Sequence, residues 1–536
     1  MIKNPILPGF HPDPSIWRVG DTYYIATSTF EWYPGVRIHK STDLVNWEFA
    51  SAPLDRAELL DMRGNPDSGG VWAPCLFYAD GKFWLVYTDM KRLDGAFKDS
   101  PNYITCCETI DGTWSDPWYV NSSGFDPSLF HEDDGRKWFV NMQWNHRGDG
   151  TGGNPAHNSF DGILLQEWDP EQGLIGKVTN IFEGTDRGVT EAPHIFKRNG
   201  WYYLTTAEGG TGYGHAVTMA RSRNIDGPYE VHPNKFLMSA RDAPDHPIQR
   251  TGHGQIVETP DGEVWHTFLM GRPIPGPDGT GRFSPMGRET GIEKCVWKDD
   301  DWLYLEHGGL LARENVPHTL HGPAPEASHY DFSGDKLHHD FQWLRTPEPD
   351  RLFRQRDGKL TLTGRESIGS WFEQSLVARR QQHFQYRAET TLETDPITYQ
   401  HASGLTTYYN RSKFHALLVT NEPGIGKALT IQSCPGDWPN GALSHPLDAP
   451  VPVPDGPVRL AVEVDHATQQ FYYAIGDGDW TPVGPILDAS VISDEGGRGE
   501  HASFTGAYVG MVAYDTSGGA GEAHFSQFSY SPTDAA

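Results

Sequence analysis

Hydrophobic and polar positions along most of this chain alternate with the period of a β-strand, and helical periodicity is weak throughout. Short runs of Ile, Val, Tyr, Phe and Trp are separated by tight-turn sequences. Five of these turns are VGD at 19–21, ADG at 79–81, DDG at 133–135, RNG at 198–200 and PDG at 260–262. Each turn lies between two strand-like runs, so each predicts a β-hairpin.

The five hairpins belong to one repeat that covers the first part of the chain. Its copies are spaced by about 60 residues and open at Asp13, Ala73, Asp126, Glu191 and His253. A segment of that length holds a four-stranded blade with its loops, and closed propellers have about four to eight blades. The repeat therefore predicts a five-bladed β-propeller over residues 1–316, with the opening residues facing one central axis.

A second domain follows a change in composition. Residues 317–328 are rich in Pro, His and small residues without an apolar period, which predicts a linker. Beyond it, apolar residues alternate strictly with polar ones around Tyr386 and again from Val458 to Ile475. This pattern predicts an antiparallel β-sandwich over residues 329–536, and the fold class as a whole is expected to be all-β.

Composition narrows the range of partners. The 536 residues include 43 basic and 71 acidic side chains, a net charge of −28 that repels polyphosphates and anionic lipid. We therefore expect no nucleic-acid and no membrane partner, and no stretch approaches the ~18 apolar residues of a membrane span. The 18 Trp, 22 Tyr and 25 Phe residues supply rings that both propeller packing and sugar stacking use.

The cysteines indicate a reducing compartment. Their number is odd, they are scattered, and one pair is vicinal, which is poor geometry for a disulfide; they are Cys75, Cys106, Cys107, Cys295 and Cys434. The first 13 residues contain no apolar run of signal-peptide length. We expect a cytoplasmic protein.

Three of the repeat-opening residues are acids, namely Asp13, Asp126 and Glu191. A single Asp before Pro is explained by turn capping, but three carboxyl groups converging on one axis repel one another and are costly without a use. Glycoside hydrolysis needs one carboxyl group with a raised pKa and one ionised carboxylate. A third carboxylate that stays ionised can raise the pKa of the acid.

Other catalytic motifs are poorly supported. The chain has no CxxC, HExxH, GxxxxGK[ST] or GxSxG motif. The glycine-rich run GGTGYG at 209–214 follows a strand, but no helix is predicted after it, so it does not indicate a phosphate-binding loop.

Several long strings together resemble the β-xylosidases of glycoside hydrolase family 43. They are PILPGFHPDPSIWRVGDTYYIATSTF, GGVWAPCLFY, GFDPSLF, TEAPHIFKRNGWYYLTTAEGG and GRET, and the resemblance covers both domains. It implies that Asp13 is the general base, that Asp126 tunes the pKa of the acid and orients it, and that Glu191 is the general acid. In such an inverting reaction the acid and base carboxyls are about 6.5–9.5 Å apart, against about 5–5.5 Å in a retaining enzyme.

The resemblance also assigns residues to the substrate. Arg288, in GRET, would donate to the terminal sugar, whereas without the resemblance a solvated ion pair with Glu289 is favoured. Independently of the resemblance, Phe30 and Trp72 occupy loop positions beside repeat starts, where an exposed ring is unusual, so we expect them to form aromatic walls, with core packing as the alternative. Phe504, in SFTGAYVG of the sandwich, would reach over the propeller and narrow the cleft into a pocket.

His253 is the one candidate metal ligand. The resemblance implies that it binds a central water or, in some members, a divalent ion such as calcium. A buried, hydrogen-bonded structural histidine is the favoured interpretation. No cofactor is expected to be required.

The predicted function is an inverting, exo-acting β-1,4-xylosidase (EC 3.2.1.37 type) that releases xylose from the non-reducing end of short xylo-oligosaccharides, with α-L-arabinofuranosidase activity as a side reaction. An α-L-arabinofuranosidase or arabinanase is the alternative within the same class. A retaining fructosidase is disfavoured because its nucleophile segment is NDPNG-like. A non-catalytic sugar-binding propeller would not need the three acids. The resemblance further implies a homo-oligomer, either a dimer or a tetramer.

Overall fold

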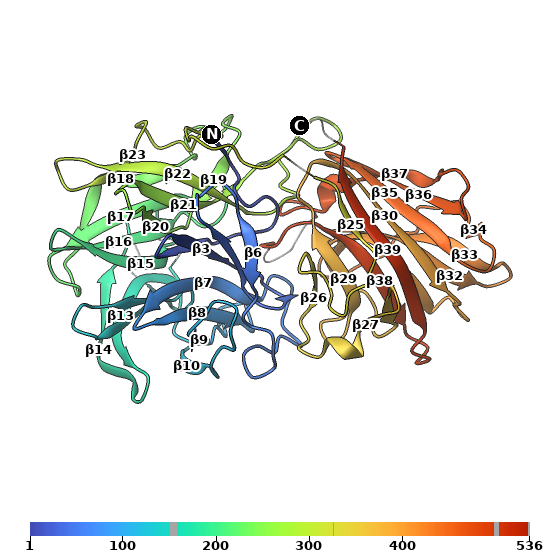
Figure 1. Ribbon diagram of the computed structural model, residues 1–536, viewed down its shortest axis with the longest axis horizontal. Coiled ribbons are helices and arrows are strands. Elements are labelled where there is room, and N and C mark those ends of the chain that lie inside the picture. Colours follow the sequence, from blue (N-terminus) through green and yellow to red (C-terminus); the bar gives the residue numbers. More distant parts are fainter. Residues whose placement is uncertain (151–157, 325, 498–502, 534–536) are drawn as a thin grey trace.

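The structure is a computed structural model that describes residues 1–150, 158–324, 326–497 and 503–533. Two β-domains lie side by side, the N-terminal one on the left and the C-terminal one on the right of Figure 1. Helical structure in the described residues includes the short 3-10 turns η2 (Pro349–Arg351) and η3 (Ala489–Val491). In the described part of the chain, no helix is both long enough and apolar enough to cross a bilayer.

The N-terminal domain consists of five antiparallel sheets arranged as propeller blades. The first blade contains β2 (Ser15–Val19), β3 (Thr22–Thr27), β5 (Arg37–Ser41) and β6 (Glu48–Ser51). The second contains β7 (Gly70–Ala79), β8 (Lys82–Met90), β9 (Asn102–Cys107) and β10 (Trp118–Asn121). The third contains β11 (Ser128–His131), β12 (Lys137–Trp144), β13 (Phe160–Asp169) and β14 (Gly173–Phe182). The fourth contains β15 (Glu191–Arg198), β16 (Trp201–Glu208), β17 (Ala216–Ser222) and β18 (Glu230–Ser239). The fifth contains β19 (Gln249–Gly252), β20 (Ile256–Glu258), β21 (Val264–Gly271), β22 (Glu289–Trp297) and β23 (Leu303–Leu305).

All five predicted hairpins are antiparallel strand pairs, formed by β2–β3, β7–β8, β11–β12, β15–β16 and β20–β21. In two of the turns, Asp80–Gly81 and Asn199–Gly200, both residues have positive φ, as a type I′ hairpin turn requires. The predicted five-bladed propeller is therefore confirmed.

The beginning and the end of the propeller domain are joined to each other. Strand β1 (Ile2–Lys3) pairs with β24 (Asn315–Val316). The Asn4 side-chain amide donates to the carbonyl oxygens of Ile292, at 2.9 Å, and Arg313, at 2.8 Å. The N-terminal segment thus runs along the fifth blade and closes the ring.

The repeat-opening residues share an uncommon backbone conformation. Left-handed φ values occur at Asp13 (56°), Ala73 (35°), Asp126 (53°), Ala192 (54°) and His253 (23°), each directly before a Pro or Gly. The prediction that Glu191 shares this position was therefore wrong by one residue. Because neighbouring side chains leave the backbone in different directions, Glu191 reaches the axis by a different route from the two aspartates.

The C-terminal domain is a sandwich of two antiparallel sheets, as predicted. One sheet contains β27 (Phe353–Arg356), β28 (Lys359–Thr363), β39 (Glu522–Pro532), β30 (Gln385–Thr394), β35 (Val458–Asp465), β36 (Thr468–Ile475) and β37 (Thr481–Asp488), with β25 (Ser328–Tyr330) beside β39. The other contains β34 (Val451–Pro452), β33 (Gly426–Pro435), β32 (Lys413–Glu422), β31 (His401–Asn410), β38 (Tyr508–Asp515), β29 (Ser375–Arg380) and β26 (Phe341–Leu344).

The predicted alternation is present in β30 and β35, but in β36 it ends at Phe471. Beyond it, Tyr473 is half-buried and Ile475 is exposed. Strand β25 begins at Ser328, the last residue of the expected linker.

A strand of the propeller extends the second sandwich sheet. Strand β4 (Trp32–Tyr33) pairs with β26, with Trp32 opposite Leu344. The Trp32 ring stacks on Tyr508 at a centroid distance of 3.6 Å and an interplanar angle of 11°. This shared sheet and core fix the sandwich against the propeller, which allows sandwich residues to contribute to a site on the propeller axis.

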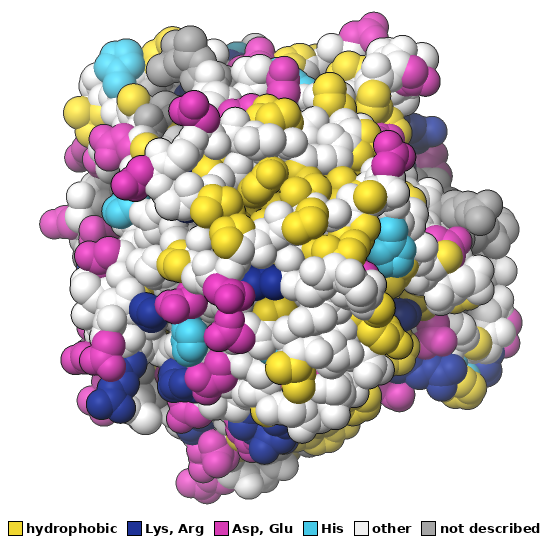
Figure 2. All heavy atoms as spheres, turned by 90° about the vertical axis from the view of Figure 1, so that its right-hand side faces the viewer, with side chains coloured by type: hydrophobic (Ala, Val, Ile, Leu, Met, Phe, Trp, Pro, Cys, Tyr) yellow, Lys and Arg dark blue, Asp and Glu magenta, His cyan; other side chains and the backbone are white. Residues whose placement is uncertain are grey.

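The far end of the sandwich carries a hydrophobic surface. Figure 2 shows hydrophobic side chains gathered near the centre of this face, with acidic and basic side chains around them. Large hydrophobic residues of the sandwich that remain exposed include Ile397 (78%), Tyr399 (59%) and Ile486 (70%). Apolar side chains that gather on one face are typical of an interaction surface, whereas single exposed apolar residues are common on any protein.

Candidate active site

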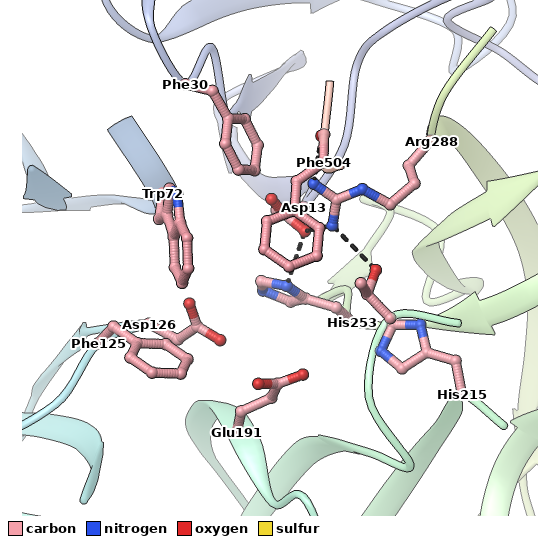
Figure 3. Close-up of a pocket in the computed structure, with 11 residues that line it drawn as sticks. Asp13, Phe30, Trp72, Phe125, Asp126, Glu191, His215, His253, Arg288 and Phe504 are labelled. Carbon is pink, nitrogen blue, oxygen red and sulfur yellow. Dashed lines mark hydrogen bonds and ion pairs between the residues drawn. The ribbon is translucent and has the colours of Figure 1, made fainter. Parts of the chain in front are cut away.

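One pocket brings together every site residue expected from the sequence (Figure 3). Three further residues line it that the sequence analysis did not name. The lining residues are Asp13, Phe30, Trp72, Phe125, Asp126, Glu191, Thr211, His215, His253, Arg288 and Phe504.

Asp13 is buried and held by three side chains. The Ser28 hydroxyl donates to its Oδ2 at 2.6 Å, His253 Nδ1 lies 3.2 Å from Oδ1, and Arg288 Nη1 lies 3.6 Å from the same oxygen. Burial alone would raise the pKa of Asp13, but the Arg288 charge and the contacts with His253 and Ser28 outweigh it and hold the pKa well below its usual range. Asp13 is therefore ionised and can accept a proton.

Glu191 has the opposite character. The residue keeps some exposure to the pocket. Desolvation of its carboxyl group by the surrounding protein and the charge of Asp13 raise its pKa to about 8. The Arg288 and Lys98 charges oppose this rise. Lys98 is itself held in place, since its Nζ donates to the Leu93 carbonyl at 2.9 Å. At neutral pH Glu191 can therefore donate a proton.

Asp126 differs from the expectation of a permanently ionised neighbour. Burial and the charges of Glu191 and Asp13 raise its pKa well above the usual range. Because electrostatic repulsion is mutual, Asp126 and Glu191 titrate as a coupled pair. Asp13 is the carboxylate that stays ionised, and it does so through direct contacts with Arg288, His253 and Ser28.

Arg288 is buried in the pocket and does not form a surface ion pair. It donates to Thr211 Oγ1 at 2.9 Å and to the Phe504 carbonyl oxygen at 2.7 Å, and its guanidinium lies 5.1 Å from the centroid of the Phe30 ring. Glu289, its expected partner in the alternative interpretation, pairs instead with Arg272 at 2.6 Å. The ion-pair alternative was therefore wrong.

Aromatic rings form one side of the pocket. The ring centroids of Phe30 and Trp72 are 5.9 Å apart, and Trp72 meets Phe504 edge-on at 5.6 Å and Phe125 edge-on at 5.2 Å. Phe30 and Trp72 are also buried in a hydrophobic core cluster, so both interpretations of these two rings hold. Phe504 comes from the sandwich, and its backbone N–H donates to the Ser68 hydroxyl at 3.0 Å.

His253 lies against Asp13 as a buried hydrogen-bonding residue, the interpretation favoured from the sequence. Another imidazole, that of His194, lies tilted against it at a centroid distance of 5.9 Å. Imidazole suits transition metals better than calcium, which takes oxygen ligands, and the Asp13 oxygens already have partners. That no divalent cation is required stays a prediction.

The structure also shows what the sequence analysis overlooked. Phe125 is part of the GFDPSLF string, directly before Asp126. Thr211 lies within the run GGTGYG, and His215 follows it. The run is a glycine-rich loop between two propeller strands, and it places Thr211 in the pocket instead of binding phosphate at a helix.

A buried ionised carboxylate, a carboxyl group with a raised pKa and a buried arginine between aromatic rings define a carbohydrate-hydrolysing site on a five-bladed propeller. Comparison with known families gives the same class. The model for glycosyl hydrolases family 43 matches residues 2–303, and the model for the beta xylosidase C-terminal concanavalin A-like domain matches residues 329–531. The chain belongs to glycosyl hydrolase family 43, and it is a glycoside hydrolase rather than a non-catalytic sugar-binding propeller.

Individual relatives match over nearly their whole length. The chain is 54% identical to xylosidase/arabinosidase 43B of Humicola insolens, over 99% of this chain and 98% of that protein. It is 47% identical to a beta-xylosidase of Bacillus subtilis, over 99% of both. The crystal structure of xylan beta-1,4-xylosidase from Bacillus halodurans C-125 superposes with a TM-score of 0.93 at 47% identity, covering 99% of this chain and all of that one.

Proposed function

We propose that this protein is an inverting, exo-acting β-1,4-xylosidase that releases xylose from the non-reducing end of short xylo-oligosaccharides. The observation that carries the proposal is the pairing, in one pocket, of an ionised Asp13 with a Glu191 whose pKa is raised to about 8. The names of the most similar relatives, which include a xylan beta-1,4-xylosidase, support the choice of substrate.

The proposed reaction is a single displacement. Asp13 accepts a proton from a water molecule, and the oxygen of that water forms a bond to the anomeric carbon. The bond from that carbon to the glycosidic oxygen breaks on the opposite face, and Glu191 protonates the departing oxygen. The configuration at the anomeric carbon inverts, and the carboxyl separation is expected to be about 6.5–9.5 Å. Asp126 is proposed to orient the acid, while burial and the charge of Asp13 keep Glu191 protonated.

The exo preference is proposed to come from the wall that the sandwich adds. Phe504 stands beside Phe30 and Trp72. Its backbone N–H donates to Ser68 and its carbonyl oxygen accepts from Arg288, which fixes the residue. A cleft closed on one side accepts a chain end but not the middle of a chain. Arg288 and the rings would hold the terminal xylose by hydrogen bonds and by stacking.

The test is proton NMR of xylobiose hydrolysis, which shows the anomer of xylose that forms first. Wild type is expected to give α-xylose first, because inversion converts the β-linkage, and Glu191→Ala is expected to lose this activity. Glu171→Ala, which changes an exposed acid on the turn between β13 and β14, is the matched control and should behave as wild type. Initial β-xylose would overturn the inverting mechanism, and no xylose from wild type would overturn the substrate.

A second candidate activity is hydrolysis of α-L-arabinofuranosides in the same pocket. It is favoured by the relative from Humicola insolens, whose name joins both activities. Xylose and arabinofuranose present similar hydroxyl patterns to the pocket. If one site serves both, each aryl glycoside should inhibit hydrolysis of the other with an inhibition constant equal to its own KM. Additive rates in a mixture would contradict a shared site.

We also propose a homo-oligomer, either a dimer or a tetramer, that buries the hydrophobic end of the sandwich. The hydrophobic side chains gathered on this face support the contact (Figure 2). Exposed large hydrophobic residues of the sandwich include Ile397, Tyr399 and Ile486. Light scattering after size-exclusion chromatography should give a mass above the 59.8 kDa of one chain, and Ile486→Asp should lower it. A wild-type mass of one chain would rule the oligomer out.

The proposed location is the cytoplasm. All five cysteines are free and buried, which suits a compartment that keeps thiols reduced. Fractionation of cells that make the protein should place its activity with a cytoplasmic marker, and activity in the medium would contradict this.

A further inference from the structure

Glu495, a sandwich residue outside the pocket lining, touches three separate segments of the propeller. Its Oε1 accepts from the Tyr213 hydroxyl at 2.8 Å and from Arg250 Nη2. Its Oε2 accepts from the Ser284 backbone N–H at 2.7 Å, and the Ser284 hydroxyl donates to Oε1 at 3.1 Å. One carboxylate therefore joins the loop between β16 and β17, strand β19 and the loop between β21 and β22.

Each of these segments carries a residue of the pocket. The loop with Tyr213 also carries Thr211 and His215, Arg250 is followed by His253, and the loop with Ser284 carries Arg288. The segments are also joined inside the pocket, since Arg288 donates to Thr211 at 2.9 Å. His215 Nδ1 lies 3.0 Å from the Arg250 carbonyl oxygen. Movement of the Glu495 contacts would therefore displace the substrate-facing groups.

The loop that needs this support most is GGTGYG. Four of its six residues are glycines, and Gly209 and Gly210 have φ values of 81° and 68°. Glycine allows many backbone conformations, so the loop's own sequence does not fix the position of Thr211. Tyr213 is its one bulky residue, and the Tyr213 ring lies beneath the Arg282 guanidinium at 3.5 Å while its hydroxyl reaches Glu495.

Glu495 itself is anchored in the sandwich. The neighbouring Asp494 accepts from the Tyr409 hydroxyl at 2.8 Å and from Arg250 Nη1 at 2.6 Å. The Tyr409 hydroxyl in turn accepts from the backbone N–H of Thr505, the residue after Phe504, at 3.1 Å. The same sandwich contacts thus hold both Glu495 and the aromatic wall.

We propose that Glu495 is a positioning residue that acts through Tyr213 and Ser284 to hold Thr211 and Arg288 against the terminal sugar. The sandwich therefore contributes to substrate binding twice, once by the Phe504 ring and once by a carboxylate that never meets the substrate. The inference rests on the proposed function only for the choice of substrate.

The test compares Tyr213→Phe and Glu495→Gln with wild type by steady-state kinetics on p-nitrophenyl β-D-xyloside and by thermal unfolding. Tyr213→Phe removes one hydroxyl group outside the pocket. Tyr202→Phe is the matched control, because it removes a hydroxyl that donates to a carboxylate, Glu132, at 2.7 Å elsewhere in the propeller. Displacements of about 1 Å can cost about 10²-fold in rate. We expect kcat/KM to fall about 10-fold or more in both variants, mostly through KM, and to stay unchanged in the control.

A double-mutant cycle separates positioning from simple stabilisation of the interface. If Tyr213 acts through Thr211, the loss in Thr211→Val plus Tyr213→Phe will be smaller than the product of the two separate losses. Unchanged kcat/KM in Tyr213→Phe and Glu495→Gln, with only a lower Tm, would overturn the proposal. If Glu495→Gln does not fold, Tyr213→Phe and the cycle decide. If wild type cleaves only α-L-arabinofuranosides, the proposed function fails, and the same ratios on that substrate still test Glu495.

Discussion

Replacing Arg288 by Met should move the acid limb of the pH profile, because this arginine is the strongest influence that keeps Asp13 ionised. Arg288 Nη1 lies 3.6 Å from Asp13 Oδ1, and both side chains are buried. At an effective dielectric constant of about 20, two unit charges at that distance attract by about 4–5 kcal/mol. One pKa unit corresponds to about 1.36 kcal/mol, so the upper bound is about 3 units, and shifts of about 1–3 units are typical of such pairs.

The sign follows from the role of Asp13 as a base. In wild type the pKa of Asp13 lies well below its usual range, so kcat/KM should stay level as the pH falls until the protein itself unfolds. In Arg288→Met, the effect of burial on the pKa of Asp13 is opposed by His253 and Ser28 without the arginine, so this pKa rises by about 1–3 units. The fall of kcat/KM at low pH then moves to higher pH by the same amount. Profiles of kcat/KM report groups of the free enzyme, which suits this question.

Arg288→Lys is the matched control for that experiment. It keeps the charge but loses the planar fork that bonds Thr211 and the Phe504 carbonyl. Its kcat/KM should therefore fall at every pH while the acid limb stays near the wild-type position. An acid limb of Arg288→Met that coincides with that of Arg288→Lys would refute the electrostatic argument, whatever the absolute rates.

Three further predictions concern the acid, the aromatic wall and the domain contact. On xylobiose, whose leaving group needs protonation, kcat/KM should fall as the pH rises through about 8, because Glu191 must carry a proton. Lys98→Met removes a charge that lowers the pKa of Glu191, so it should move this alkaline limb to higher pH. An unmoved limb, or an equal shift in the control variant Lys235→Met, which changes an exposed lysine, would contradict this. Phe504→Ala keeps the backbone bonds of this residue but removes the ring, so KM should rise about 10-fold, equivalent to about 1.4 kcal/mol, and an unchanged KM would contradict its role. Trp32→Ala should lower the free energy of unfolding in urea by about 3–5 kcal/mol, since the ring is fully buried between the domains, and a loss below about 1 kcal/mol would contradict this packing.

Local chemistry in the sequence was sufficient to predict the strands and to bring acidic residues to one axis. The two-residue period and the Gly-containing turns specify hairpins without reference to distant residues. The repeat of about 60 residues then places Asp13 and Asp126 on one axis, because equivalent positions in a propeller face the same way. The resemblance to a known family added Arg288, Phe504 and the individual roles of the three acids.

Only the tertiary structure decided how these groups influence one another. A pKa depends on burial and on charges within a few ångströms, and no sequence pattern states that Arg288 rather than solvent stabilises the Asp13 carboxylate. Ala192, and not Glu191, has the left-handed backbone conformation that Asp13 and Asp126 have in their repeats, so Glu191 is offset by one residue. The acidic side chains alone did not indicate this offset.

The contacts between the domains were equally out of reach of the sequence. Strand β4 joins a sheet whose other members begin about 300 residues later, and Glu495 meets Tyr213 across 282 positions. The periodicity of apolar residues indicates which face of a strand is buried, but it does not indicate which other part of the chain covers that face. The sequence by itself therefore determined the two all-β domains and the acids of the site, whereas the packing of one domain on the other decided the shape of the pocket and the charge state of its groups.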